Sequence, residues 1–418
     1  MTTLDTQDIA ALTDDRAPRE PISSAPAIVL CVLALLTIGV VMVTSAGLEI
    51  ESVSLDAELG DAVAGSPGLL EVLTSKSVIL MGLAVAALAV AALTPVNRAR
   101  RILAPLAGKA SARPLVTLSL GILPLVGLLV LVLIPGVGLE KKGASRWLPL
   151  PGMGAQGFQP SELAKWGLVL VLAWYATTIG PRIKTALDGL LPGAIVVGLV
   201  AGLIAKEDLG TGVLVAAVAG VVLVAAGVRL LYVVPAGILA LAGAVGLVVT
   251  SDYRTDRVIA YLDPYADPVG TGYHMIQSMA TIAGAGPAGT GLGHGIQKFG
   301  YLPEDTNDFL FAVITEELGF FGALLVITPL LVLVWVLRGV VARTQDKFTR
   351  LVVLGIASTI ALQTMINLVV VTGLGPTKGI ALPLVSAGGT GWILTAASLG
   401  LVIALERADA ARQTPDLA

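Results

Sequence analysis

The chain has 418 residues, of which 56% are hydrophobic and only 13% are charged, and its formal net charge is −3. A soluble domain carries about a quarter of charged residues on average, so this composition argues against a soluble protein and predicts that lipid covers much of the chain. The absence of a strongly basic tract argues against nucleic acid as a partner, and two histidines with the single Cys31 argue against a zinc cage or an intrachain disulfide.

Ten apolar runs along the chain are long enough to cross about 30 Å of hydrocarbon. Backbone groups in lipid must be hydrogen-bonded within their own segment, so we expect each run to be an α-helix. Residues 1–24 lack the basic region of a signal peptide, so the first run is read as a retained span. The expected spans are 26–46, 77–94, 115–135, 162–179, 188–204, 211–228, 231–250, 309–337, 351–373 and 382–404.

These runs predict an all-α, polytopic bundle of about ten transmembrane helices within residues 26–404, with tails at 1–25 and 405–418. Loops 95–114, 180–187 and 338–350 are rich in Lys and Arg, whereas loop 47–76 is acidic. Because cytoplasmic loops carry the excess of basic residues, we expect both termini in the cytoplasm.

The same orientation places the long connection between spans seven and eight, residues 251–308, outside the cell. It is rich in Gly, Pro, Asp and aromatic residues. A connection of this length is usually functional or disordered, and its aromatic content favours function. Within it, residues 274–290 are expected to form a short helix against the bundle.

Several charged residues remain near the expected outer face, where ionisable groups are costly and usually pair, face a cavity or do chemistry. Glu162 and Lys165 stand one helical turn apart at the start of the fourth span, which also fits a simple surface pair. Arg146 precedes a turn rich in Pro and Gly, and we expect it to contact an anion or a headgroup. Glu316 and Glu317 fit hydrogen-bond partners inside the bundle.

Asp308 lies where a polar loop enters the apolar eighth span, directly before Phe309. A carboxylate there is partly desolvated, which favours its protonated form and makes it a usable proton acceptor. An aspartate that caps the N-terminus of the eighth span is the alternative. The position alone leaves both interpretations open.

Four sequence blocks follow one another across most of the chain. They are GASRWLPLPGMGAQGFQPSELAK at 143–165, DLGTG at 208–212, GTGLGHGIQKFGYLPEDTNDFLFAVITEELGFFG at 289–322 and PTKGIALPLVSAGGTG at 376–391. Together they resemble the signatures of the SEDS family (shape, elongation, division and sporulation). The TKG of 377–379 and the GLG…QK…YLPE pattern resemble the division branch, FtsW, more than the elongation branch, RodA.

This resemblance implies a peptidoglycan glycosyltransferase that polymerises lipid II at the outer face of the bacterial cytoplasmic membrane, at the division septum for the FtsW branch. It also implies partners: a class B penicillin-binding protein (an FtsI-like transpeptidase) and other divisome membrane proteins. The second substrate would be a glycan linked to polyprenyl pyrophosphate. A lipid II flippase, a RodA-like elongation polymerase and a structural division scaffold are the rival interpretations.

The essential aspartate of the family falls on Asp308, which would take the proton of the acceptor sugar hydroxyl. Positive charge must face the pyrophosphate leaving group. No cofactor is assigned: a divalent cation, Mg²⁺ or Mn²⁺, and a metal-free site rich in cations are the alternatives, and the metal site is unknown. The candidate substrate-binding residues are Arg146, Lys142, Lys165, Glu162, Lys378, Gln277 and Ser386, with Glu162 and Lys165 bracing the cavity.

The chain departs from the family pattern around this aspartate. Thr306 and Asn307 stand where the family commonly has histidine and threonine, and His274 replaces the glutamine of a GYQ pattern. Ala387 replaces a tyrosine of the last signature, and residues 206–207 are Lys-Glu instead of the usual Gln-Pro. We therefore expect altered substrate contacts around an unchanged Asp308.

Overall fold

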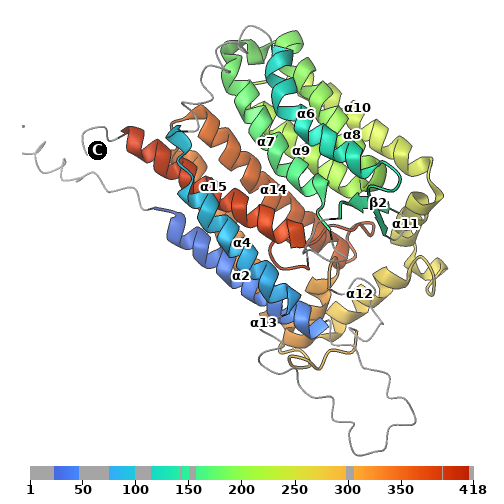
Figure 1. The fold of residues 1–418 in the computed structure, drawn as a ribbon. Helices are drawn as coiled ribbons and strands as arrows, with labels where there is room; N and C mark the ends of the chain where they lie inside the picture. Colours follow the sequence, from blue (N-terminus) through green and yellow to red (C-terminus); the bar gives the residue numbers. More distant parts are fainter. Residues whose placement is uncertain are drawn as a thin grey trace, which may run out of the picture.

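The computed structural model describes residues 23–46, 75–98, 114–141, 144–149, 157–297, 306–387 and 389–413. These residues form a bundle of long helices and one short antiparallel hairpin, β1 (Leu139–Lys141) and β2 (Ala144–Trp147) (Figure 1). The helices are α2 (Ala25–Ala46), α4 (Lys76–Leu93), α6 (Pro114–Val132), α7 (Pro160–Thr178), α8 (Leu191–Glu207), α9 (Leu209–Ala226), α10 (Leu230–Val249), α11 (Asp252–Leu262), α12 (Tyr273–Gly284), α13 (Leu310–Arg343), α14 (Lys347–Val371) and α15 (Gly389–Gln413).

Each of the ten expected spans coincides with one of these helices, so the prediction of a polytopic helical bundle is confirmed. Among the described helices, eight are long and apolar enough to cross a membrane, and α6 and α7 are 19-residue helices that pack together beside them. The expected helix in 274–290 is α12, which ends earlier, at Gly284. The chain is a multi-pass membrane protein.

The boundaries of the last span are the main correction to the expected helices. The helix begins at Gly389 instead of at residue 382. Pro383 and Leu384 form a turn in which Leu384 has a φ of 62°, and this backbone conformation cannot be part of an α-helix. It then continues to Gln413, so most of the expected tail at 405–418 is helical.

The helices form two groups joined by α14 (Figure 1). Helices α2, α4, α13 and α15 pack on one side, α6, α7, α8 and α9 pack on the other, and α14 contacts members of both. A Cβ on Gly400 of α15 would lie 2.2 Å from the Leu88 carbonyl of α4, so a glycine is needed for this close crossing. Helix α10 lies at the margin, with none of its residues buried.

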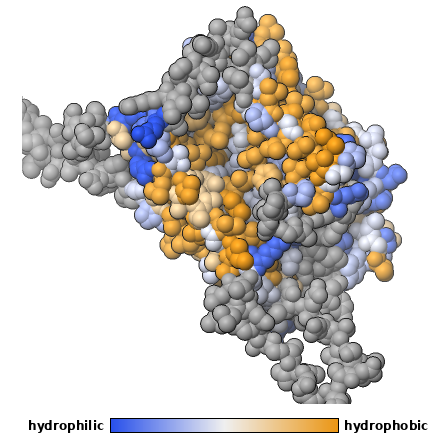
Figure 2. Space-filling view, in the orientation of Figure 1, coloured by the Kyte–Doolittle hydropathy of each residue, from blue (hydrophilic) through white to orange (hydrophobic). Residues whose placement is uncertain are grey.

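Hydrophobic side chains also cover much of the outside of the bundle. Figure 2 shows hydrophobic atoms across the middle of the visible face, with hydrophilic atoms gathered toward its ends. Large apolar residues of α10 such as Leu231, Leu239 and Val249 are exposed. An apolar surface of this extent fits lipid contact, where each helix satisfies its own backbone.

The helix connections gather at two opposite ends of the bundle. At one end, the Ser24 hydroxyl donates to Glu406, and the Asp409 carboxylate accepts the N–H groups of Gln345 and Asp346 at 3.1 Å. The β-hairpin, α11 and α12 lie at the other end, which we call the hairpin end (Figure 1). The chain thus brings several sequence-distant polar segments together at the hairpin end.

Candidate active site

A cavity of about 380 Å³ opens at the hairpin end. Its walls come from α11, from the start of α12, from the start of α13 and from the loop that connects α14 to α15. The lining residues are Tyr253, Asp256, Arg257, Asp267, Gly270, Thr271, His274, Asp308, Phe309, Thr377, Lys378 and Gly379. Two of the predicted site residues, Asp308 and Lys378, therefore meet in one cavity; we call it the Asp308 cavity.

Asp308 is half-buried in the turn that leads into α13. Its backbone carbonyl accepts a hydrogen bond from Asn367 Nδ2 of α14 at 2.9 Å, and the same amide donates to the Ile380 carbonyl at 2.8 Å. A Cβ on Gly379 would lie 3.0 Å from Asp308 Oδ2, so glycine leaves room for the carboxylate. The N-cap residue of α13 is Phe309, with no side-chain cap, which argues against the N-cap alternative for Asp308.

The residues that depart from the family pattern lie close to this turn. The Ala387 N–H donates to the Thr306 carbonyl at 2.9 Å, which joins the turn before α13 to the α14–α15 loop. The ring of His274 stacks on Phe309, with 6.1 Å between the centroids and 23° between the planes. Thr306, Ala387 and His274 thus lie at or next to the turn that contains Asp308.

Lys378 stands on the α14–α15 loop, on the wall of the Asp308 cavity. Burial lowers the pKa of its ammonium; nearby Asp208 raises that pKa, and Arg257 and Arg254 lower it further. Arg257 Nη1 donates to the Thr377 carbonyl at 3.3 Å, beside Lys378. Lys378 of this loop and Arg257 of α11 therefore line the same cavity as Asp308, and Lys378 is partly desolvated there.

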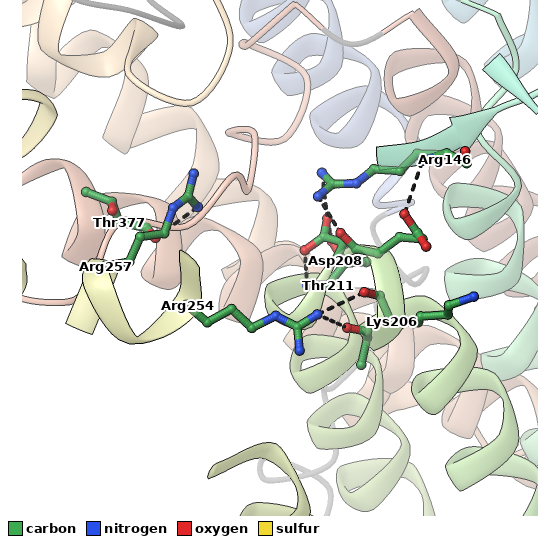
Figure 3. A network of polar contacts seen from close by, with 10 residues as sticks. Arg146, Lys206, Asp208, Thr211, Arg254, Arg257 and Thr377 are labelled. Atoms are coloured by element: carbon green, nitrogen blue, oxygen red, sulfur yellow. Dashed lines mark hydrogen bonds and ion pairs between the residues drawn. The ribbon is translucent and has the colours of Figure 1, made fainter. Parts of the chain in front are cut away.

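Arg146 belongs to a different set of contacts. It projects from β2, donates from Nη2 to the Glu207 carbonyl, and its Nη1 lies 3.8 Å from Asp208 Oδ2 (Figure 3). Asp208 also caps α9, accepting the N–H and the hydroxyl of Thr211 at 3.0 and 2.8 Å. Arg146 is thus balanced by Asp208, and it lines a small separate pocket, not the Asp308 cavity.

Helix α11 is fixed to the bundle by two arginines that stand three residues apart. Arg254 Nη2 donates to the carbonyls of Ala205 and Lys206, at the C-terminal end of α8, at 3.0 and 2.8 Å (Figure 3). Arg257 lies one turn further along and carries its guanidinium 4.5 Å from the ring centre of Tyr253. These contacts place the Asp256 and Arg257 side of α11 at the cavity.

Lys165 and Glu162 form a closed cluster inside the bundle. The Lys165 ammonium, 3% exposed, lies 2.8 Å from Glu162 Oε2 and donates to Gln363 Oε1 of α14 at 3.0 Å. Gln363 in turn donates from Nε2 to the Ala381 carbonyl at 2.8 Å. The cluster connects α7 and α14 to the α14–α15 loop and does not line the cavity, so the expected support of the cavity stays a prediction.

Among the described residues, two further candidates, Ser386 and Gln277, make no contact that supports substrate binding. Ser386 is 1% exposed and its hydroxyl accepts the Leu382 N–H at 2.9 Å, which stabilises the loop. Gln277 is half-buried on α12, away from the lining of the cavity. Lys142 lies outside the described residues. For these three, substrate binding stays a prediction.

Glu316 and Glu317 act as structural hydrogen-bond acceptors, as expected. Glu317, fully buried, accepts the Ser45 hydroxyl of α2 at 2.8 Å and the Gly293 N–H at 2.9 Å. Glu316 accepts the Ile296 N–H at 2.9 Å. Both carboxylates therefore hold the 289–297 segment against α13.

Several cavity residues were not singled out from the sequence. Tyr253, Asp256 and Arg257 share one face of α11 at helical spacing. This spacing is hard to recognise in the sequence because the long connection around it has a mixed composition. Asp267 closes the turn before α12, accepting the Thr271 N–H at 2.8 Å. Across the described part of the chain, no group of three or more His, Cys, Asp and Glu side chains is arranged to hold a metal ion.

Comparisons with known proteins agree with the sequence blocks. The model of the cell cycle protein family, which groups FtsW, RodA and SpoVE, matches residues 26–411. The chain is 42% identical over 277 residues to a probable peptidoglycan glycosyltransferase FtsW of Geobacter sp. strain M18, covering 66% of this chain and 75% of that one. It is 40% identical over 281 residues to stage V sporulation protein E of Bacillus subtilis strain 168, covering 67% and 76%.

Solved structures show the same arrangement of helices. A structure that describes coordination of polymerization and crosslinking by a peptidoglycan synthase complex matches with a TM-score of 0.66 and 29% identity, over 91% of this chain and 97% of the other. The rod shape determining protein RodA of Thermus thermophilus matches with a TM-score of 0.59 and 25% identity over the same shares.

Proposed function

The chain belongs to the cell cycle protein family of FtsW, RodA and SpoVE and is a peptidoglycan glycosyltransferase, and we propose that it polymerises lipid II in the Asp308 cavity. The observation that carries this proposal is the convergence of Asp308, Lys378 and Arg257 on one cavity at the end of a membrane bundle. A carboxylate beside two cations suits a reaction that removes a proton from one substrate and expels a pyrophosphate from the other.

Asp308 is the general base in this mechanism. It takes the proton of the acceptor sugar 4-hydroxyl while that oxygen forms a bond to the anomeric carbon of the donor. The bond from this carbon to the polyprenyl pyrophosphate breaks, and the pyrophosphate leaves with the bonding electrons. Attack opposite the leaving group converts an α-linkage into a β-1,4 linkage.

Lys378 and Arg257 face the negative charge that develops on the pyrophosphate. Both line the Asp308 cavity, whereas the charges of Arg146 and Lys165 are balanced by Asp208 and Glu162. Fixed cations aimed at a leaving group are effective in a partly desolvated site because water screens them less.

The membrane orientation follows from the basic loops. We place the hairpin end outside the cytoplasm, with both termini in the cytoplasm, because the Lys- and Arg-rich loops connect the helices at the opposite end. Lipid II and the growing glycan would then meet at the outer face. The similarity to FtsW proteins favours the division septum over the lateral wall.

The proposed protein partner is a single-span class B penicillin-binding protein, with further divisome membrane proteins around it. The similar solved structure is of a complex that joins polymerization and crosslinking. Helix α13 offers an apolar face for a partner helix, formed by exposed Phe320, Phe321, Leu324, Leu325, Leu331 and Trp335.

A lipid II flippase is the rival that the test must separate. The purified protein, with its partner, is incubated with radiolabelled lipid II as wild type and as Asp308→Asn, and a parallel assay follows lipid II movement across vesicles. The proposal predicts that Asp308→Asn loses glycan product and keeps its unfolding temperature. Glycan synthesis at the wild-type rate in Asp308→Asn would contradict the proposed mechanism. A wild-type protein that moves lipid II across vesicles without making glycan would favour the flippase.

A further inference from the structure

His274 is a second titratable group on the wall of the Asp308 cavity that the proposed mechanism does not use. It lies in the first turn of α12, and its ring is near two aromatic rings. Phe309 stacks on it at 6.1 Å, and Tyr273 meets it edge-on at 6.4 Å and 77°. The imidazole is therefore placed at the cavity next to the residue that follows the catalytic aspartate.

We propose that His274 is a substrate-binding residue that contacts the pyrophosphate of the lipid-linked substrate, so that substrate affinity falls as the imidazole loses its proton. This inference rests on the proposed function. Histidine changes charge between about pH 5 and 8, whereas the glutamine that the family pattern carries here is always neutral. An imidazolium can donate a charge-assisted hydrogen bond to a phosphate oxygen, which is stronger than one between neutral groups.

The charges around the cavity set the direction of the effect. Asp256 and Arg257 face it from α11, Asp267 from the turn before α12, Asp308 from the start of α13 and Lys378 from the α14–α15 loop. The two phosphates of a pyrophosphate diester each keep a single charge over this pH range, so the substrate itself does not change charge. Protonation of His274 thus adds a third cation to Arg257 and Lys378 and strengthens pyrophosphate binding.

The Asp267 carboxylate, in the turn before α12, also keeps its charge over this pH range. The backbone N–H of Thr271 is the main cause that holds the pKa of Asp267 below its usual range, and the N–H of Gly270 adds to it. A change in substrate affinity near neutral pH is therefore assigned to the imidazole and not to this aspartate.

The test measures KM and kcat for radiolabelled lipid II polymerisation between about pH 5.5 and 8, with the purified protein in complex with its partner. We expect the wild-type KM to rise about tenfold across this range, as for the loss of one charge-assisted hydrogen bond. In His274→Gln the rise is absent and KM stays near the high-pH value of the wild type. A rise in KM of equal size in both proteins would belong to another group, such as Lys378, and would overturn the proposal.

His294 provides the matched control, because the chain has two histidines and this one is exposed, with Nδ1 3.0 Å from the Leu292 carbonyl. His294→Gln should keep the wild-type KM profile. The proposal is overturned if His274→Gln retains the pH-dependent KM, or if only kcat changes. Asp308→Asn in the same assay separates the two proposals: polymerisation at the wild-type rate there contradicts the proposed mechanism, whatever His274 does.

Discussion

Two groups of charged side chains lie near the hairpin end, and they are built in opposite ways. Around Lys165, the ammonium, the Glu162 carboxylate and the Gln363 amide satisfy one another in a closed cluster. Around Asp308, the charged groups line a cavity of about 380 Å³. Charge within a membrane bundle therefore indicates chemistry only where the surroundings also leave room for a ligand.

The largest expected difference between the two groups is in stability. Lys165→Met leaves the Glu162 carboxylate without its buried cation, which costs about 3–5 kcal/mol of unfolding free energy. Denaturant or thermal unfolding in detergent measures it. The double variant Glu162→Gln with Lys165→Met should recover most of the lost unfolding free energy, because no unpaired charge remains. Equal losses of unfolding free energy in the single and double variants would refute the closed cluster.

An intermediate effect is expected at the open cavity. Lys378→Met should raise KM for lipid II about tenfold, because it removes one charge-assisted contact to the pyrophosphate, and should leave the unfolding temperature unchanged. Lys206→Met is the control, since this lysine is exposed at the end of α8 and its side chain is not part of the cavity lining. An unchanged KM in Lys378→Met would place the pyrophosphate elsewhere.

The smallest effect on substrate use is expected at Arg146. Its guanidinium is balanced by Asp208 and holds the β-hairpin to the α8–α9 junction. Arg146→Ala should therefore change KM by less than about threefold. Its main consequence should be faster proteolysis of the hairpin. The partly exposed Arg146–Asp208 pair contributes about 1 kcal/mol or less to stability. A tenfold rise in KM would return Arg146 to the anion-binding residues.

The fold was predictable because a membrane imposes a simple rule on the sequence. Any segment that crosses hydrocarbon must be apolar and helical, so run length alone located all ten spans. The start of the last helix was missed because residues 382–388 are also mainly apolar. Hydropathy does not register the turn at Pro383 and Leu384.

The active site was predictable only in part. Asp308 could be found because it interrupts an apolar pattern, and Lys378 because it lies in a short loop between spans. His274 was noted only as a departure from the family pattern. Arg257 could not be found, since only the packing of α11 brings it to the cavity. For the same reason the sequence could not show that Arg146 faces Asp208, a residue 62 positions further along the chain.

The role of Asp308 as the base of this polymerase can be tested by comparing it with the other carboxylates of the cavity. Asp308→Asn, Asp256→Asn and Asp267→Asn are purified with the partner and incubated with radiolabelled lipid II, and the glycan product is quantified. We expect Asp308→Asn to lower the rate about 100- to 10,000-fold, and the other two variants to stay within about tenfold of wild type. A folded Asp308→Asn protein that polymerises lipid II at the wild-type rate would contradict it.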